Sequence, residues 1–222
     1  AAWCPRAFPD RPSVGMIWGM TTTRERILDT AELRFVRQGF SATTVAQLID
    51  DAQVAKGTFY HHFTSKEEVM TAVIERQGAR LVTSAEQIAA DRSQPALARA
   101  ARIVSGGLDR PATVDQLGEE LERSGNELMR LRALDATCQA LLGPLRQCLA
   151  EAVTNREIDP IDPEPAAATL LLLGAHAVDR DLFGWSAAGD LARLVPTAER
   201  LLGARPGALA QLLGPALTGP RG

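Results

Sequence analysis

The sequence predicts an all-α protein in which an amino-terminal unit of three short helices is followed by a larger helical body. Ala, Leu, Arg and Glu, which favour helices, are abundant, whereas alternating runs of Val, Ile and Thr are scarce. Three Ser or Thr residues are each followed, three positions later, by Glu or Gln, which is the pattern of a helix capping box. The apolar residues behind each of these signals recur at helical spacing.

The first helix is predicted to begin after Thr22, because Glu25 completes a capping box, and to end at Gly39. We expect residues 1–20, which contain prolines, glycines and only a short, broken apolar stretch, to form a disordered leader. The inner face of the first helix carries Ile27, Ala31 and Phe35.

The next three helices are predicted in the same way. Thr44 and Gln47 open the second helix, a short break follows at residues 53–54, and the third helix occupies residues 55–63. A further capping box, Ser65 with Glu68, opens a longer fourth helix. The buried face of the second helix is expected to carry Val45, Leu48, Ile49 and Ala52.

The remaining helices are indicated less clearly by the sequence. A proline cannot donate the interior hydrogen bond, so Gly143-Pro144 is expected to end one helix and Pro144 to begin the next. Residues 159–165 contain three prolines and are expected to form a stiff connector. Helices are predicted at 96–104, 114–123, 126–142, 144–157, 166–183, 190–202 and 209–213.

Composition excludes several functions. The 222 residues carry a net charge of −3, so any attraction to nucleic acid must be local, as in residues 55–66, which hold two lysines, two histidines and no carboxylate. Three scattered cysteines do not make a disulfide framework or a zinc site, so we expect no metal, no cofactor and a reducing, cytoplasmic location. No run of about 18 apolar residues is present, so no membrane span is expected.

Residues 44–63 have the pattern of a helix-turn-helix that places its second helix in the major groove of DNA. Phe59 and Phe63, one turn apart, are expected to anchor this helix inward. Gly57 would let the backbone approach DNA closely because it has no side chain. The polar residues expected to contact bases or phosphates are Lys56, Thr58, Tyr60, His61 and, just beyond the helix, Lys66.

The run from Ile27 to Val73 resembles the amino-terminal signature of the tetracycline-repressor (TetR) family, most closely at Lys56-Gly57-Thr58-Phe59-Tyr60-His61-His62-Phe63 and the following Ser65-Lys66-Glu67. The resemblance implies a ligand-responsive transcriptional regulator, by default a repressor, and no enzymatic activity. It implies that Thr44 caps the second helix and touches a phosphate, and that Lys66 holds the DNA backbone. It also implies that Lys56, Gly57, Thr58, Tyr60 and His61 face the groove.

Three positions depart from the family's pattern. Gln53 stands where the turn usually has glycine, so a non-glycine residue is expected at positive φ. Ala46 replaces a usual polar or basic residue, which removes one DNA contact. Arg34 replaces a usual apolar residue of the first helix, which is expected to shift its packing.

The rest of the chain is expected to form dimers and bind an effector. Residues 166–183 are apolar around the helix and, with 190–202, would form a two-fold four-helix interface, so that the dimer meets an inverted-repeat operator. We predict a disordered leader at 1–20, a DNA-binding domain at 21–66 and an effector-binding and dimerisation domain at 67–222. A small hydrophobic effector would enter the body between Leu81 and Leu149 and release the DNA. Candidate contacts are Met129, Leu131, Leu134, Cys138 and His176.

Three alternatives remain. A constitutive DNA-binding regulator would need no effector. An enzyme would have to use Cys138 or Cys148 with His176, without a phosphate loop, zinc motif or serine elbow. A protein-interaction module could have kept the fold and lost DNA binding, as the departures at Gln53 and Ala46 would allow.

Overall fold

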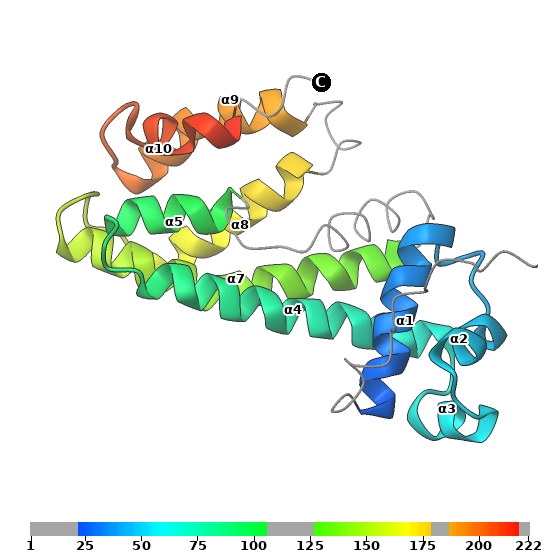
Figure 1. The fold of residues 1–222 in the computed structure, drawn as a ribbon. Helices are drawn as coiled ribbons and strands as arrows, with labels where there is room; N and C mark the ends of the chain where they lie inside the picture. The colour runs from blue at the N-terminus through cyan, green and yellow to red at the C-terminus, as the bar shows by residue number, and fades with distance from the viewer. Residues whose placement is uncertain (1–21, 106–126, 179–186, 218–222) are drawn as a thin grey trace, which may run out of the picture.

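The computed structural model describes residues 22–105, 127–178 and 187–217, and this part of the chain is helical without any strand (Figure 1). The predicted leader and the predicted helix at 114–123 lie outside these residues. The helices are α1 (Thr23–Gln38), α2 (Val45–Ala52), α3 (Lys56–His62), α4 (Lys66–Ala90), α5 (Ala96–Val104), α7 (Glu127–Thr154), α8 (Pro163–Val178), α9 (Ala187–Leu202) and α10 (Ala208–Leu217).

The predicted amino-terminal caps are present. The hydroxyls of Thr22 and Ser65 each accept a hydrogen bond from the amide three residues on, at 3.2 and 3.1 Å, and Thr44 forms a complete capping box. One detail differs from the prediction. The Glu68 carboxylate accepts from the amide and hydroxyl of Thr64, at 2.6 and 2.8 Å, so its return bond reaches one residue further back than a capping box requires.

Gln53 adopts the left-handed conformation expected of the turn, with φ 51° and ψ 49°. This conformation costs a non-glycine residue free energy, so the surrounding contacts must hold it. Its amide donates to the Asp50 carbonyl at 3.1 Å, and the Arg26 guanidinium donates to the carbonyls of Ala52 and Gln53 at 3.0 and 3.1 Å. The end of α2 is therefore capped by a side chain from α1.

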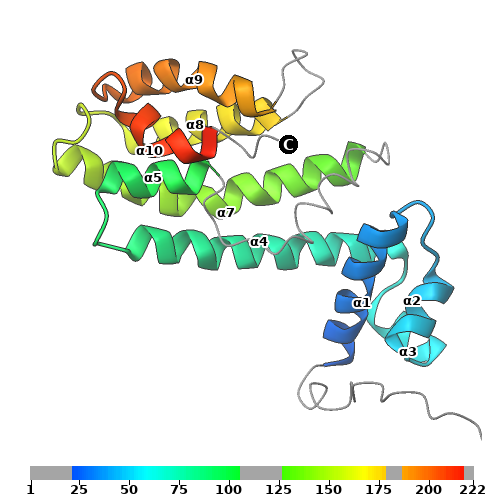
Figure 2. The same ribbon diagram turned by 45° about the horizontal axis from the view of Figure 1, so that its top comes forward.

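The prediction that a helix ends at Gly143-Pro144 is wrong, because α7 continues through Pro144 to Thr154. Proline removes one hydrogen bond and crowds the carbonyl four residues earlier, but buried residues on both sides of it secure the helix against its neighbours. Figure 2 shows α7 lying beside α4 along its length, with α5 and α8 against its carboxy-terminal half. These buried residues include Ala140, Leu141, Leu145, Cys148 and Leu149.

Two further differences from the predictions concern α8 and α10. The α8 helix begins at Pro163, inside the predicted connector, because proline is accommodated in the first turn of a helix. The α10 helix, at Ala208–Leu217, is twice as long as the predicted segment at 209–213. By contrast, α5 occupies the predicted residues 96–104.

The described residues pack into two hydrophobic clusters. The first joins α1, α2, α3 and the start of α4, and it also includes Met129 from α7. The second joins the far half of α4 with α5, α7, α8, α9 and α10. The helix-turn-helix therefore has a core of its own, to which α7 contributes the buried Met129 and, packed against it, the partly buried Ala133 and Ala136.

Candidate nucleic-acid interface

The α3 helix has one buried face and one exposed face. Phe59 and Phe63 are 0% and 2% exposed, and their ring centroids lie 6.1 Å apart. Tyr60, in contrast, is 47% exposed, and its ring lies edge-to-face with that of Phe59, with 5.5 Å between the ring centroids. Lys56, Gly57 and His61 are also exposed, and Thr58 is half-buried. The orientation predicted from the phenylalanine spacing is therefore present.

Gly57 lies on this exposed face in the first turn of α3. A Cβ atom built at Gly57 would meet no other heavy atom within 4 Å. The residue is helical, without a positive φ. Neither packing inside the protein nor backbone conformation thus requires a glycine here, although glycine weakens a helix.

Thr44 is exposed at the start of α2, where it serves as the N-cap. Its hydroxyl accepts from the Gln47 amide at 3.3 Å and donates to the Gln47 side-chain carbonyl at 3.1 Å. The hydroxyl oxygen retains a second acceptor lone pair, but its proton is already engaged. The capping role predicted for Thr44 is confirmed, and the phosphate contact remains a prediction.

Lys66 does not lie free on the surface as a phosphate ligand would. Its ammonium donates to the carbonyls of Phe40, Ser41 and Thr43, at 3.0, 3.2 and 3.0 Å. The same group lies 4.6 Å from the centroid of the Phe40 ring. This position differs from the one expected for a phosphate contact, because all three ammonium hydrogens have protein acceptors.

Two further cations of this unit are used internally, and sequence reasoning did not assign them these roles. Arg34, at a position where an apolar residue was expected, pairs with Asp51 of α2 and donates to the Gln38 side chain at 2.6 Å. The interaction with Asp51 raises the pKa of the Arg34 guanidinium. Arg26 caps α2, as described above. The Arg26 contacts leave no pattern of side chains in the sequence, because both of its acceptors are backbone carbonyls. Ala46 is exposed on α2.

The structure does not bring the candidate effector residues together. Met129 is 4% exposed within the first cluster, next to the helix-turn-helix, whereas Leu131 is 49% exposed. Leu134 and Cys138 are half-buried, and burial raises the pKa of the Cys138 thiol. The side chain of His176 lies outside the described residues. None of the four described residues lines either of the two hollows described next.

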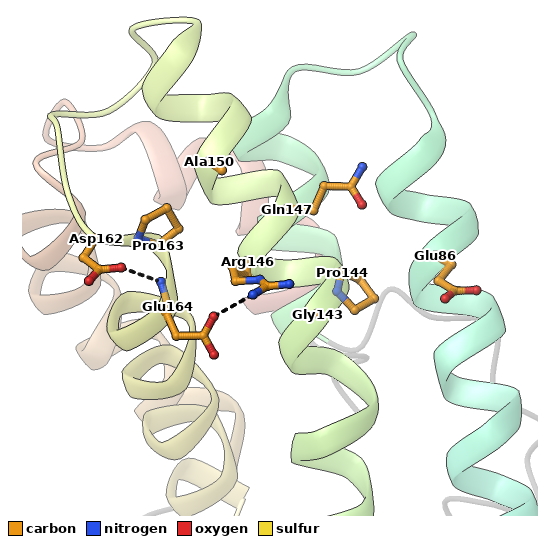
Figure 3. Close-up of a pocket in the computed structure, with 9 residues that line it drawn as sticks. All are labelled: Glu86, Gly143, Pro144, Arg146, Gln147, Ala150, Asp162, Pro163 and Glu164. Carbon is orange, nitrogen blue, oxygen red and sulfur yellow. Dashed lines mark hydrogen bonds and ion pairs between the residues drawn. The ribbon is translucent and has the colours of Figure 1, made fainter.

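One hollow is an open polar groove of about 640 Å³ between α4, α7 and the start of α8 (Figure 3). Gly143 and Pro144 line it, and Arg146 reaches across to the carboxylate of Glu164 at 3.0 Å. Asp162 accepts from the Glu164 amide at 3.1 Å, and so caps α8. The polar residues drawn there thus satisfy one another in part.

The other hollow is an apolar cavity of about 60 Å³ between α5, α8, α9 and α10. Sequence reasoning missed it, although its α5 residues recur at helical spacing. The buried carboxylate of Glu199 lies nearby in α9, but it is engaged by the amides of Gly207, Leu209 and Ala210 at 2.9–3.3 Å. The lining residues are Leu97, Ala100, Ala101, Val104, Leu170, Leu173, Leu194, Val195, Ala198, Leu202, Leu209 and Leu213.

The described part of the chain offers no metal site, because no group of three or more His, Cys, Asp or Glu side chains in it could hold a metal ion. Nor does any of these helices combine the length and apolar character that crossing a membrane requires.

Curated proteins match the chain over about a quarter of its length. The transcriptional repressor NemR of Escherichia coli is 42% identical over 57 residues, which cover 26% of this chain and 29% of NemR. The repressor KstR2 of Mycolicibacterium smegmatis is 36% identical over 66 residues, 30% of each chain. The chain therefore covers less than a third of the length of these relatives. Both are named as transcriptional repressors.

Solved structures share the fold over most of the chain. Salmonella enterica GusR has a TM-score of 0.56 at 22% identity and covers 86% of this chain and 94% of its own. RolR, solved in complex with the ligand resorcinol, has a TM-score of 0.61 at 17% identity, with 86% and 92% covered. Residues 27–73 match the family described as "Bacterial regulatory proteins, tetR family". The amino-terminal part of the chain is thus similar to the tetR family of bacterial regulatory proteins, and its α3 helix, with buried phenylalanines and an exposed polar face, agrees with that likeness.

Proposed function

We propose that this protein is a dimeric transcriptional regulator that binds operator DNA through the exposed face of α3. The observation that carries the proposal is Gly57. Alanine would fit at this position and would favour the helix by about 0.5–1 kcal/mol, so folding does not account for the glycine. A duplex lying against the face of Lys56, Tyr60 and His61 does account for it, because a Cβ would then meet DNA backbone.

The substitution Gly57→Ala tests this proposal. Duplexes that the parent binds are first selected from random DNA, and the affinities of parent and variant are then compared. We expect the variant to be at least as stable as the parent and to bind at least about tenfold more weakly, a loss of roughly 1.4 kcal/mol. Gly143→Ala is the matched control, because it also has open space in a helix but lies far along α7. Equal affinities for all three proteins would contradict the proposal.

Dimerisation is proposed to occur through α8 and α9. Support comes from apolar side chains that the single chain leaves uncovered, since Leu172 of α8 is 57% exposed and Leu201 of α9 is 40% exposed. Two copies related by a two-fold axis would present their α3 helices to successive major grooves, roughly 34–36 Å or somewhat more apart. Leu172→Glu should weaken self-association in sedimentation experiments, and a parent that is monomeric at all concentrations would contradict this part.

We further propose that an uncharged, apolar effector releases the DNA and that its site is the cavity under α10, in place of the region first predicted. A charged ligand would find no partner there, because every lining residue is Leu, Val or Ala. RolR, which has the same fold, was solved with resorcinol. A ligand can shift the equilibrium only by its differential affinity for the two states, so binding and release must be measured separately.

The experiment uses benzene as a first probe of the cavity and thermal stability as the readout. Benzene should stabilise the parent and fail to stabilise Ala198→Leu, which fills the cavity, whereas Ala79→Leu on the exposed side of α4 should respond like the parent. Larger apolar compounds are then screened for operator release. Binding without release would favour the constitutive regulator, and no binding would refute this site.

A further inference from the structure

Lys66 is the first residue of α4, directly after the helix-turn-helix. A cation is unfavourable at this end of a helix, where the macrodipole is positive. Its ammonium turns away from α4 and reaches back to residues 40–43, more than twenty positions earlier in the chain. The connection from α1 to α2 lies there, so Lys66 joins the start of α4 to the start of α2.

The carbonyls that Lys66 contacts belong to a tight connection in which several other polar groups are also hydrogen-bonded. The Thr43 hydroxyl donates to the Gly39 carbonyl at 2.7 Å, and the Thr43 amide donates to Phe40 at 3.2 Å. The Gln38 side chain donates to the Ala42 carbonyl at 2.8 Å. Lys66 supplies donors for the carbonyls of Ser41 and Thr43 and a second donor for Phe40.

We propose that Lys66 is a positioning residue, an internal strut that fixes α2 relative to α3 and α4, and not a phosphate ligand. The inference rests on the proposed DNA-binding function. Three donors of one ammonium are matched by three carbonyls, and the Phe40 ring covers it at 4.6 Å, so a phosphate would have to displace existing contacts. Thr44, the cap of α2, follows the last of these carbonyls directly. Loss of the strut would therefore move a residue expected at the DNA surface.

The two roles predict different salt dependence. Removal of a phosphate contact reduces the slope of log affinity against log salt concentration by about one unit, whereas removal of a strut leaves the number of phosphates contacted unchanged. For Lys66→Met we expect a slope within about 0.3 of the parent's, and a Tm lower by about 3 °C or more. Lys56→Met, on the exposed face of α3, is the matched control, with a slope reduced by about one and an unchanged Tm.

The substitution Lys66→Arg also distinguishes an internal strut from a phosphate ligand. Arginine would restore a phosphate contact, because it carries the same charge and binds phosphate well. Its planar, fork-shaped donors do not match three carbonyls arranged around one ammonium, so Lys66→Arg should behave like Lys66→Met. Well below both melting temperatures, each Lys66 variant should lose at least about tenfold in affinity for the selected operator. Affinity for unrelated duplexes should change less than about threefold, because it depends on phosphate contacts.

A measurement on the parent protein covers the case in which a variant does not fold. Acetylation of lysine amines, followed by mass spectrometry, should modify Lys56 quickly in the free protein and slowly with operator bound. Lys66 should be slow in both states. The strut is refuted if Lys66 is acetylated as fast as Lys56 in the free protein, if Lys66→Met reduces the salt slope by about one at an unchanged Tm, or if Lys66→Arg restores the parent's affinity. A parent that binds no duplex would instead refute the proposed function, and the Tm and acetylation results would still decide the strut.

Discussion

The ion pairs between α1 and α4 allow a quantitative prediction for Arg76→Met. The Arg76 side chain is 13% exposed and donates to Asp29 and Glu32, each at 2.6 Å. The Asp29 side chain is 49% exposed, so its pair contributes little. The Glu32 side chain is only 8% exposed, and Arg80 lies 3.7 Å from its carboxylate. A buried carboxylate that loses its short ion pair with Arg76 is destabilised, even with Arg80 nearby.

Breaking a fully buried pair costs about 3–5 kcal/mol, and the remaining contact with Arg80 lowers our expectation for Arg76→Met to about 2–3 kcal/mol. For a chain of this size that corresponds to a decrease in Tm of roughly 4–12 °C. Urea unfolding followed by helical circular dichroism measures it. Adding Glu32→Gln should restore at least about 1 kcal/mol of the free energy of unfolding relative to the sum of the single changes, because it removes the buried carboxylate charge that has lost its pair with Arg76. A single variant within about 0.5 kcal/mol of the parent, or strict additivity, would refute the reasoning.

The other predictions concern a turn, a cap and the thiols. Gly203→Ala should destabilise the protein more than Gly207→Ala in urea unfolding. Both glycines have a positive φ (58° and 84°), but only at Gly203 would the new Cβ overlap a neighbouring side chain, with Cγ of Asp159 at 2.6 Å. Equal losses of stability would contradict this. Hydrogen bonds from the backbone and side chain of Thr64 lower the pKa of Glu68 below its ordinary 4.5. The stability advantage of the parent over Glu68→Gln should therefore be full above pH 4.5 and decline as the pH falls below it. A stability difference that does not change with pH would count against the Glu68–Thr64 contact. Burial raises the pKa of both Cys138 and Cys148, so iodoacetamide at pH 8 should label half-buried Cys138 slowly and fully buried Cys148 only on unfolding, which peptide mass spectrometry can test.

The fold could be predicted where local chemistry decides the structure. Helix starts followed from Thr22, Thr44 and Ser65, whose hydroxyls satisfy amides that would otherwise lack a partner. The boundary at Pro144 was predicted wrongly because a local rule about one missing hydrogen bond competes with the burial of both halves of α7, which only the tertiary structure reveals. Propensity and proline rules act within one turn, whereas packing acts along the whole helix.

The candidate site could be predicted in part for the same reason. The spacing of Phe59 and Phe63 determines which side of α3 is buried, and therefore which side is exposed. The contacts of Lys66 could not be predicted, since backbone carbonyls 23 to 26 positions away leave no trace in the pattern of side chains. The apolar cavity likewise depends on four helices that meet only in three dimensions.

The position of Met129 in the first cluster has a practical consequence for protein engineering. A chimaera that joins residues 21–66 to another regulator's body would lack most of the start of α4 and Met129 of α7, both of which contribute to the first cluster. The graft would carry a cavity in this core and would be destabilised, whatever operator it was meant to bind. Swaps of recognition specificity in this protein should transplant only the exposed surface of α3, and leave the interlocked framework with its native body.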